Sequence, residues 1–327
     1  MNDTPVTKEM IEIHEPHWVS KAAFPVLTAI FFLTQAALAL AVYFSVYWCA
    51  VPLALISSHL MHGMLIGLHE ASHGLLRKSR LLNEIDGTII GAFGLTSFSL
   101  YRIVHQSHHA HLATEQDEEL WPFVKPGIAR PARVLAAVLE LCLGLFYTPF
   151  LFLRAFLRKG STIRRKTLRR RIWMEFLLAA FVWALLLTAV VWWDAWKYFL
   201  WLYLAPAWLA ANMQSLRKYI EHVGLTGSTV NGSTRSIVSR GLLGRLVAFT
   251  LLHEPYHGVH HRHSGLSHAR LPQFAALLEP AIPSEKPPFR SYTHAFLDLF
   301  RSLANPKVGA QWQGARPSRG PSLASAR

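Results

Sequence analysis

The sequence has few cysteines and little charge. Only two of its 327 residues are cysteines, Cys49 and Cys142, which is too few for a disulfide framework or a cysteine-based zinc site. Charged residues make up 16% of the chain, against about 25% in ordinary soluble proteins. Residues 1–20 lack the basic-then-apolar order of a cleavable signal peptide, and we expect none. These absences argue against a disulfide-bonded secreted domain and against a typical soluble globule.

Long apolar runs are what the sequence has instead, and they predict two membrane hairpins. Residues 24–68 contain almost no charge. Because about 20 residues cross a bilayer, we expect two helices there that turn near Ser45. A second hairpin is predicted over residues 172–214, with a polar tip at Asp194–Lys197. Aromatic residues flank this tip, as they do at membrane surfaces: Trp192, Trp193, Trp196 and Tyr198.

Two further apolar stretches do not fit a simple crossing. Residues 88–101 are too short to span a bilayer. Residues 135–157 are long enough but contain Pro149, and basic residues lie on both sides of them, at 130–133 and 158–171. The positive-inside rule places both flanks on the cytoplasmic side, so we expect an interfacial or re-entrant helix. An ordinary span is the alternative.

Positive charge is in excess and lies beside the apolar runs. The chain has 33 Lys and Arg against 19 Asp and Glu. In a soluble protein this excess would suggest a nucleic-acid partner. Next to membrane spans it favours anionic lipid headgroups and control of orientation, and we expect no nucleic-acid partner. The hairpin tips carry few positive charges, so both hairpins should open toward the cytoplasm.

Histidines are clustered at helical spacing. Of 18 histidines, 12 lie in four short stretches. Residues three or four apart share one face of a helix, so each of three stretches can direct its histidines at one ion. Neutral imidazole suits iron, zinc, copper and nickel. Nine ligands are too many for one ion and suit two: His69, His73, His105, His108, His109, His222, His257, His260 and His261.

The residues next to these ligands have weaker assignments. Glu70, Glu221 and Glu254 each adjoin a proposed ligand, where they would either orient imidazoles or form ion pairs with arginines. His253 is a further candidate for an orienting role, as are His111 and His263. Isolated histidines are more often ordinary polar residues: His14, His17, His59, His62, His268 and His294.

Two other functions use some of these features. His69-Glu70-Ala71-Ser72-His73 also matches H-E-x-x-H, the pattern of zinc metalloproteases. An intramembrane protease would leave the other two clusters unexplained. A metal transporter would place ligands within the spans along a crossing path, whereas here they stand at span ends or in polar loops.

The three boxes together resemble the membrane fatty acid desaturase family, which includes related hydroxylases. That family is marked by an HxxxH box, an HxxHH box and a later HxxHH box, which read here His69–His73, His105–His109 and His257–His261. The resemblance extends over roughly residues 24–300. Family members supply one more histidine after the fourth span, and His222 is similarly placed.

The resemblance implies an all-α membrane protein with four spans below a cytosolic cap that holds two ferrous ions. It also implies dioxygen as oxidant and a lipid or acyl-chain substrate. No His-Pro-Gly-Gly haem motif is present, so the electron donor should be a separate protein, ferredoxin-like or similar. Acyl-lipid desaturation is the first expectation. Hydroxylation of a lipid, alkane or carotenoid-like substrate is the second, because residues 219–225 look like a segment of membrane alkane hydroxylases.

These expectations divide the chain into consecutive regions, with the site on the cytoplasmic side of a bacterial inner membrane. The regions are a cytosolic segment at 1–23, hairpin 1 at 24–68, a cytosolic region with two boxes at 69–134, an interfacial or re-entrant helix with a basic segment at 135–171, hairpin 2 at 172–214, a cytosolic cap at 215–304 and a disordered tail at 305–327.

Overall fold

A computed structural model describes residues 18–313, and this part of the chain is mostly helical and contains no β-strand. Its one β-bridge joins Ile237 to Phe289. The larger helices are α3 (Ala23–Tyr43), α4 (Tyr47–Ser72), α5 (Arg80–Phe93), α6 (Phe98–Ala110), α7 (Arg130–Leu157), α8 (Lys166–Trp192) and α10 (Ala205–His222). The shorter ones are α2 (Trp18–Lys21), α9 (Trp196–Phe199), α11 (Val230–Ser233), α12 (Leu242–Thr250), α13 (His257–Arg262) and α14 (Tyr292–Leu303), with the π-helix η1 (Leu200–Leu204) and the 3₁₀ helices η2 (His268–Leu278) and η3 (Ala310–Trp312).

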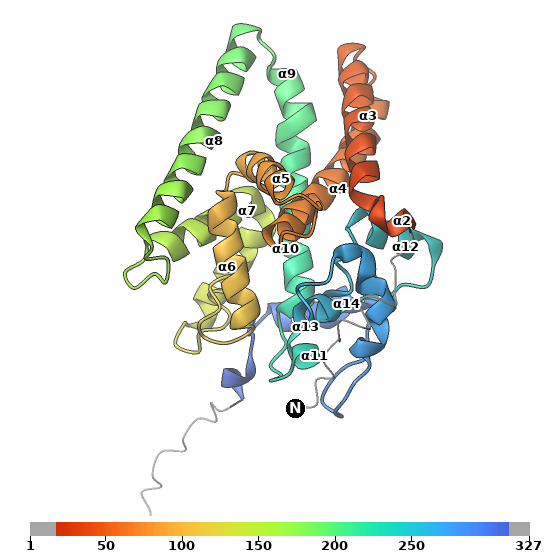
Figure 1. Cartoon of the computed structure of the whole chain (residues 1–327). Coiled ribbons are helices and arrows are strands. Elements are labelled where there is room, and N and C mark those ends of the chain that lie inside the picture. Colours follow the sequence, from red (N-terminus) through yellow and green to blue (C-terminus); the bar gives the residue numbers. More distant parts are fainter. Residues whose placement is uncertain (1–17, 314–327) are drawn as a thin grey trace, which may run out of the picture.

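The first helix pair is closely packed. α3 and α4 lie against each other and are joined by a tight turn in which Ser45 adopts a positive φ of 56°. Two glycines of α4 allow this approach: a Cβ on Gly67 would lie 2.7 Å from the Phe24 ring, and one on Gly63 would lie 3.0 Å from Leu27. Both helices rise to the upper end of Figure 1.

The second pair is splayed rather than packed. α8 and the helical run α9–η1–α10 meet at their tip around Asp194 and then diverge, and α5 lies between them (Figure 1). α5 ends there with carbonyl groups that its own helix cannot satisfy. The Trp183 indole of α8 donates to the Ala92 carbonyl at 3.0 Å, and the Tyr203 hydroxyl of η1 donates to the Phe93 carbonyl at 2.6 Å. These bonds matter because backbone exposed to lipid has no water to bind.

The apolar segment 88–101 is divided between two helices. α5 and α6 meet at a bend of 100° around Gly94–Ser97. After the bend, the carboxylate of Glu175 from α8 accepts hydrogen bonds from the Ser97 hydroxyl at 2.6 Å and from the Ser99 amide at 2.8 Å. The start of α6 is thereby capped by a neighbouring helix, and α6 carries the second histidine box away from the turn.

α7 is long and apolar but is broken near its middle. Leu143 has non-helical angles of φ −127° and ψ 34°. The groups freed at the break are satisfied by α10, because Asn212 accepts from the Gly144 amide at 2.8 Å and Trp208 donates to the Cys142 carbonyl at 2.6 Å. In Figure 1, α7 does not extend to the upper end, where both helix-pair tips lie.

Four helices in the described residues are long and apolar enough to cross a membrane: α3, α4, α7 and α8. Four membrane-spanning helices were also predicted, but the set differs by one helix. Residues 196–214, predicted as one arm of the second hairpin, form α9, η1 and part of α10, so a π-helix interrupts the run. α7 is long and apolar enough to cross a membrane, although it was predicted not to cross.

The chain after Asn305 differs from the predicted disordered tail. Val308 is fully buried, and the Trp312 indole donates to the Phe123 carbonyl at 2.8 Å. Arg133 of α7 reaches this segment, donating to the Asn305 side chain at 2.6 Å. Composition misled the prediction, because a segment poor in apolar residues still packs when neighbours bind its backbone. Residues 314–327 lie outside the described range.

Both ends of α7 contact the histidine-bearing half of the molecule. At its start Arg133 binds Asn305, and at its end Arg154 binds the Glu118 carboxylate at 2.6 Å, close in sequence to the second histidine box. A helix that crossed the bilayer would place these ends about 30 Å apart on opposite faces. That α7 does not cross stays a prediction, and both of its ends contact segments of the histidine-bearing half.

This topology is testable with cysteines in a variant whose Cys49 and Cys142 are replaced by serine. Thr162→Cys, in the exposed loop after α7, and Ser228→Cys, exposed in the cap, should both react with a membrane-impermeant maleimide from the cytoplasmic side only. The reason is parity: α7 precedes both positions, so a crossing by α7 would place both on the face opposite the first two histidine boxes. Labelling of Thr162→Cys from the outside alone would contradict this topology.

Candidate metal centre

Four helices deliver nine histidine side chains to one buried region. His69 lies on the last turn of α4, and His73 directly follows that helix. α6 carries His105, His108 and His109. α10 ends at His222, and the short helix α13 supplies the third box: His257, His260 and His261.

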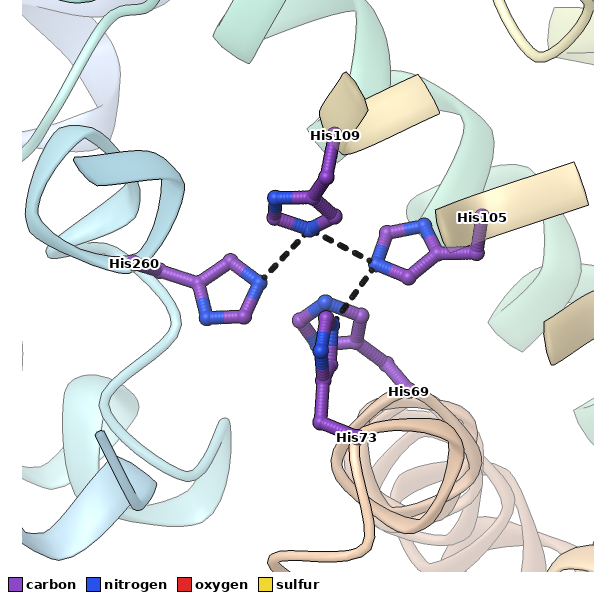
Figure 2. Close-up of side chains that lie close together, drawn as sticks. All are labelled: His69, His73, His105, His109 and His260. Carbon is purple, nitrogen blue, oxygen red and sulfur yellow. Dashed lines mark hydrogen bonds between the residues drawn. The ribbon is translucent and has the colours of Figure 1, made fainter. Parts of the chain in front are cut away.

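The first group contains five imidazoles, shown in Figure 2: His69, His73, His105, His109 and His260. One ring nitrogen from each lies within 4.8 Å of the others. Three of the contacts join Nε2 atoms at 3.1 Å, from His105 to His73, from His105 to His109 and from His109 to His260. The fifth ring, His69, lies 4.5 Å from both His105 and His260 between ring centroids.

The second group adjoins the first and contains the other four imidazoles. The Nε2 atom of His257 lies 2.9 Å from that of His222 and 3.0 Å from that of His261. His108 completes the group, with its ring 5.0 Å from His222 and 4.9 Å from His261. The two groups are adjacent, since the rings of His109 and His261 stack at 4.3 Å.

Hydrogen bonds at Nδ1 fix the tautomers of several rings. His105 bonds to Glu119 at 2.9 Å, and His108 bonds to Asp117 at 2.8 Å. His257 bonds to Glu254 at 2.9 Å, and His222 bonds to the Ser233 carbonyl at 3.1 Å. Since ionised carboxylates and carbonyls only accept, each Nδ1 carries the proton. Each Nε2 therefore presents a lone pair.

This arrangement fits bound cations. The Nε2 atoms of His222 and His257 lie 2.9 Å apart although both are acceptors, and two lone pairs at that distance repel unless a positive charge lies between or beside them. Likewise, Nε2 of buried His69 lacks a hydrogen-bond partner. Imidazole ligands with their other nitrogen bound to a carboxylate or carbonyl are the usual form of a histidine metal site.

Burial keeps the imidazoles of the third box neutral. It lowers the pKa of His257 to about 4, and, together with the neighbouring His69, it lowers the pKa of His260 well below the ordinary value. Burial alone would raise the pKa of Glu254, but His69 and Arg217 hold it well below its usual range. At neutral pH the imidazoles of the third box are therefore neutral and the Glu254 carboxylate beside them is ionised.

A buried arginine connects these carboxylates. The Arg217 guanidinium of α10 donates to Glu221 at 2.5 Å and to Glu254 at 2.8 Å. Glu254 also lies 3.2 Å from Nδ1 of His69. Burying charges is costly unless they are paired, and here the pairing joins α10, α4 and the segment before α13. The carboxylates predicted to orient imidazoles or pair with arginines thus include one, Glu254, that does both.

The chain matches the model of a known protein family. A model of the family described as fatty acid desaturase matches residues 45–293. The chain belongs to the fatty acid desaturase family. A search of curated proteins found no match. Membership makes it a lipid oxidoreductase of a membrane enzyme family, and the histidine clusters are consistent with the metal dependence of the desaturases.

The predicted orienting residues are placed unequally in this member of the family. Glu254 touches two ligands as described, while Glu221 lies 3.6 Å from Nε2 of His257 and is paired with Arg217. Glu70 lies 4.0 Å from Nδ1 of His69 and accepts from the His268 amide. His253 lies outside both groups, and its ring stacks on His268 at 5.9 Å.

The sequence patterns did not identify two carboxylates that orient imidazoles. Asp117 and Glu119 lie in the turn after α6 and hold His108 and His105. A signal was present, because residues 115–119 contain four acidic residues directly after the second box, in a chain with few of them.

We expect the protein to bind two metal ions per chain, one for each histidine group. Plasma emission spectrometry after anaerobic loading with ferrous iron should give about two irons per chain, because nine ligands in two groups suit two ions. Chelation should remove both ions together with activity. One zinc per chain with protease activity would contradict the assignment.

Glu119→Gln should weaken metal binding without removing a ligand. An amide can accept from the His105 Nδ1 proton but lacks the charge, and loss of such a partner typically costs about 10–100-fold in affinity or activity. The matched control is Glu115→Gln, an exposed position of the same turn. Competition with a fluorescent chelator measures the affinity. Equal loss in both variants would show that Glu119 acts only on the stability of the turn.

Proposed function

We propose that this desaturase-family protein uses dioxygen and two iron ions to introduce a double bond into a fatty acyl chain. Support comes from the partition of nine histidines into groups of five and four, which suits a pair of ions and leaves no box unused. A single-zinc protease would need only three of these ligands. We assign the iron ions to these nine side chains: His69, His73, His105, His109 and His260 for one, and His108, His222, His257 and His261 for the other.

An apolar cavity beside the histidines supports a chain-like substrate. It has a volume of about 600 Å³ and is enclosed by α3, α4, α5, α7 and α10, within the range usual for ligand sites. At its inner end lie Tyr101, whose ring stacks on His105 at 5.4 Å, and Glu119, which holds His105. A methylene chain that filled this cavity would end beside the first histidine group.

The proposed reaction balances when a separate protein donates two electrons. The substrate loses two hydrogens, that is two electrons and two protons, and the donor supplies two more electrons. With two further protons from the solvent, these reduce dioxygen to two molecules of water. When bound, the ions would supply the redox chemistry, while the protein supplies position and excludes side reactions. The separate donor would approach the basic surface near Lys159, Arg164 and Arg165, which are exposed and would attract an acidic carrier.

Hydroxylation is the second candidate, supported by the likeness of residues 219–225 to alkane hydroxylases. It differs only in where the chain stands relative to the ions, since the same oxidant can return oxygen to the first carbon attacked. Small differences in placement decide between such outcomes. The active side would be cytoplasmic in either case.

Mass-spectrometric lipid profiling of expressing cells decides between the two. We expect lipids whose mass falls by two hydrogens, and their absence from cells that express His105→Ala, which removes a ligand. His294→Ala is the control, because this exposed histidine only bonds to Ser291 at the start of α14. A gain of one oxygen would replace desaturation by hydroxylation. Identical lipids in His105→Ala and wild type would reject both.

A further inference from the structure

The cavity has its mouth between α3 and α5. Among the residues that line it, three are exposed: Phe32 of α3 at 65%, and Ile89 and Phe93 of α5 at 53% and 42%. The other lining residues are buried or half-buried. All three exposed residues are apolar, so the opening has an apolar rim.

The surface around this mouth is also apolar. On α3 the neighbouring Ile30 and Leu33 are exposed, and on α5 Ile85 is exposed. Contiguous apolar patches of this kind are rare on proteins surrounded by water, but they are ordinary on helices in contact with lipid. The mouth therefore faces the hydrocarbon of the bilayer.

One edge of the cavity marks the depth of the lipid headgroups. Arg77, between α4 and α5, pairs with Asp86 at 2.7 Å, and both side chains are partly exposed. The Arg77 guanidinium also lies 4.7 Å from the centre of the Phe24 ring. Charged side chains near helix ends extend to the membrane surface. A lipid in the bilayer could thus keep its headgroup near Arg77 while its chain passes between α3 and α5.

The interior continues from this mouth to the histidines without a charged barrier on the α4 side. Met64, Leu65 and Leu68 of α4 line the path, and Tyr101 stands at its end against His105. The charged lining residues Glu140 and Lys218 are paired with each other on the opposite wall.

We propose that the substrate is a lipid already dissolved in the bilayer, which enters sideways between α3 and α5, and not a water-soluble thioester delivered from the aqueous phase. The inference rests on the proposed function for its chemistry. Its own basis is separate: the three most exposed lining residues are apolar and lie on the lipid-facing surface of α3 and α5, so the cavity opens to hydrocarbon there.

Photolabelling in proteoliposomes tests this route without any turnover. The probe is a phosphatidylcholine with a diazirine on one acyl chain, and adducts are mapped by peptide mass spectrometry. We expect adducts on the interior residues Met64 and Tyr101. Ile89→Trp should reduce them several-fold, because the larger ring fills the mouth. Ile85→Trp is the matched control: it lies one turn earlier on α5, is 42% exposed and is outside the cavity lining, so interior labelling should stay unchanged.

The second arm uses a coenzyme A thioester with the same diazirine chain, added from the aqueous side. Interior adducts from the thioester but not from phosphatidylcholine would overturn the proposal, as would equal interior labelling in Ile89→Trp and wild type. Both variants should retain the metal content of wild type. A protein that shows the expected labelling but no change in cellular lipids would refute the proposed function and leave the access route standing.

Discussion

Lone pairs that face one another at about 3 Å are the constraint on which the rest of this structure depends. The Nε2 atoms of His222 and His257, both acceptors, lie 2.9 Å apart. Glu254, Ser233 and Glu119 bind the Nδ1 protons and so turn the lone pairs inward. Such an arrangement is unfavourable by itself and favourable around cations. We therefore expect the cap to gain much of its stability from metal binding.

α10 is the element that carries this arrangement into the membrane region. It packs against both α4 and α7. Its last two turns place Arg217, Lys218 and His222 in three roles: Arg217 pairs with Glu221 and Glu254, Lys218 pairs with Glu140 of α7, and His222 joins the second histidine group. Removing one partner of a buried pair leaves an uncompensated charge, which costs about 3–5 kcal/mol. These buried ion pairs thus fix how α10 packs against α7 and against the segment before α13.

The position of α5 has a similar physical reason and a functional consequence. A helix that ends among other helices at membrane depth needs donors for its last carbonyls, and Trp183 and Tyr203 provide them. The two donor rings also contact each other at 4.8 Å between centroids, so α8 and η1 meet at this end of α5. The same placement leaves Ile89 and Phe93 on the rim of the cavity. The position of α5 therefore has two effects. It satisfies the last carbonyls of the helix, and it leaves an opening through which the proposed substrate can enter.

Local patterns determined much of this protein. The apolar runs determined the helices around Ser45 and Asp194, because a bilayer requires a minimum apolar length. The i, i+3 and i, i+4 spacing determined which histidines act together, because those residues share one helix face. Only the tertiary structure decided how nine histidines divide into five and four, since His260 and His261 are adjacent in sequence and enter different groups. It also decided that Asp117 and Glu119 bond to His108 and His105, that His253 lies outside both groups, and that the chain around Val308 is packed. These outcomes depend on contacts between segments far apart in the chain, and periodicity within one segment carries no information about them.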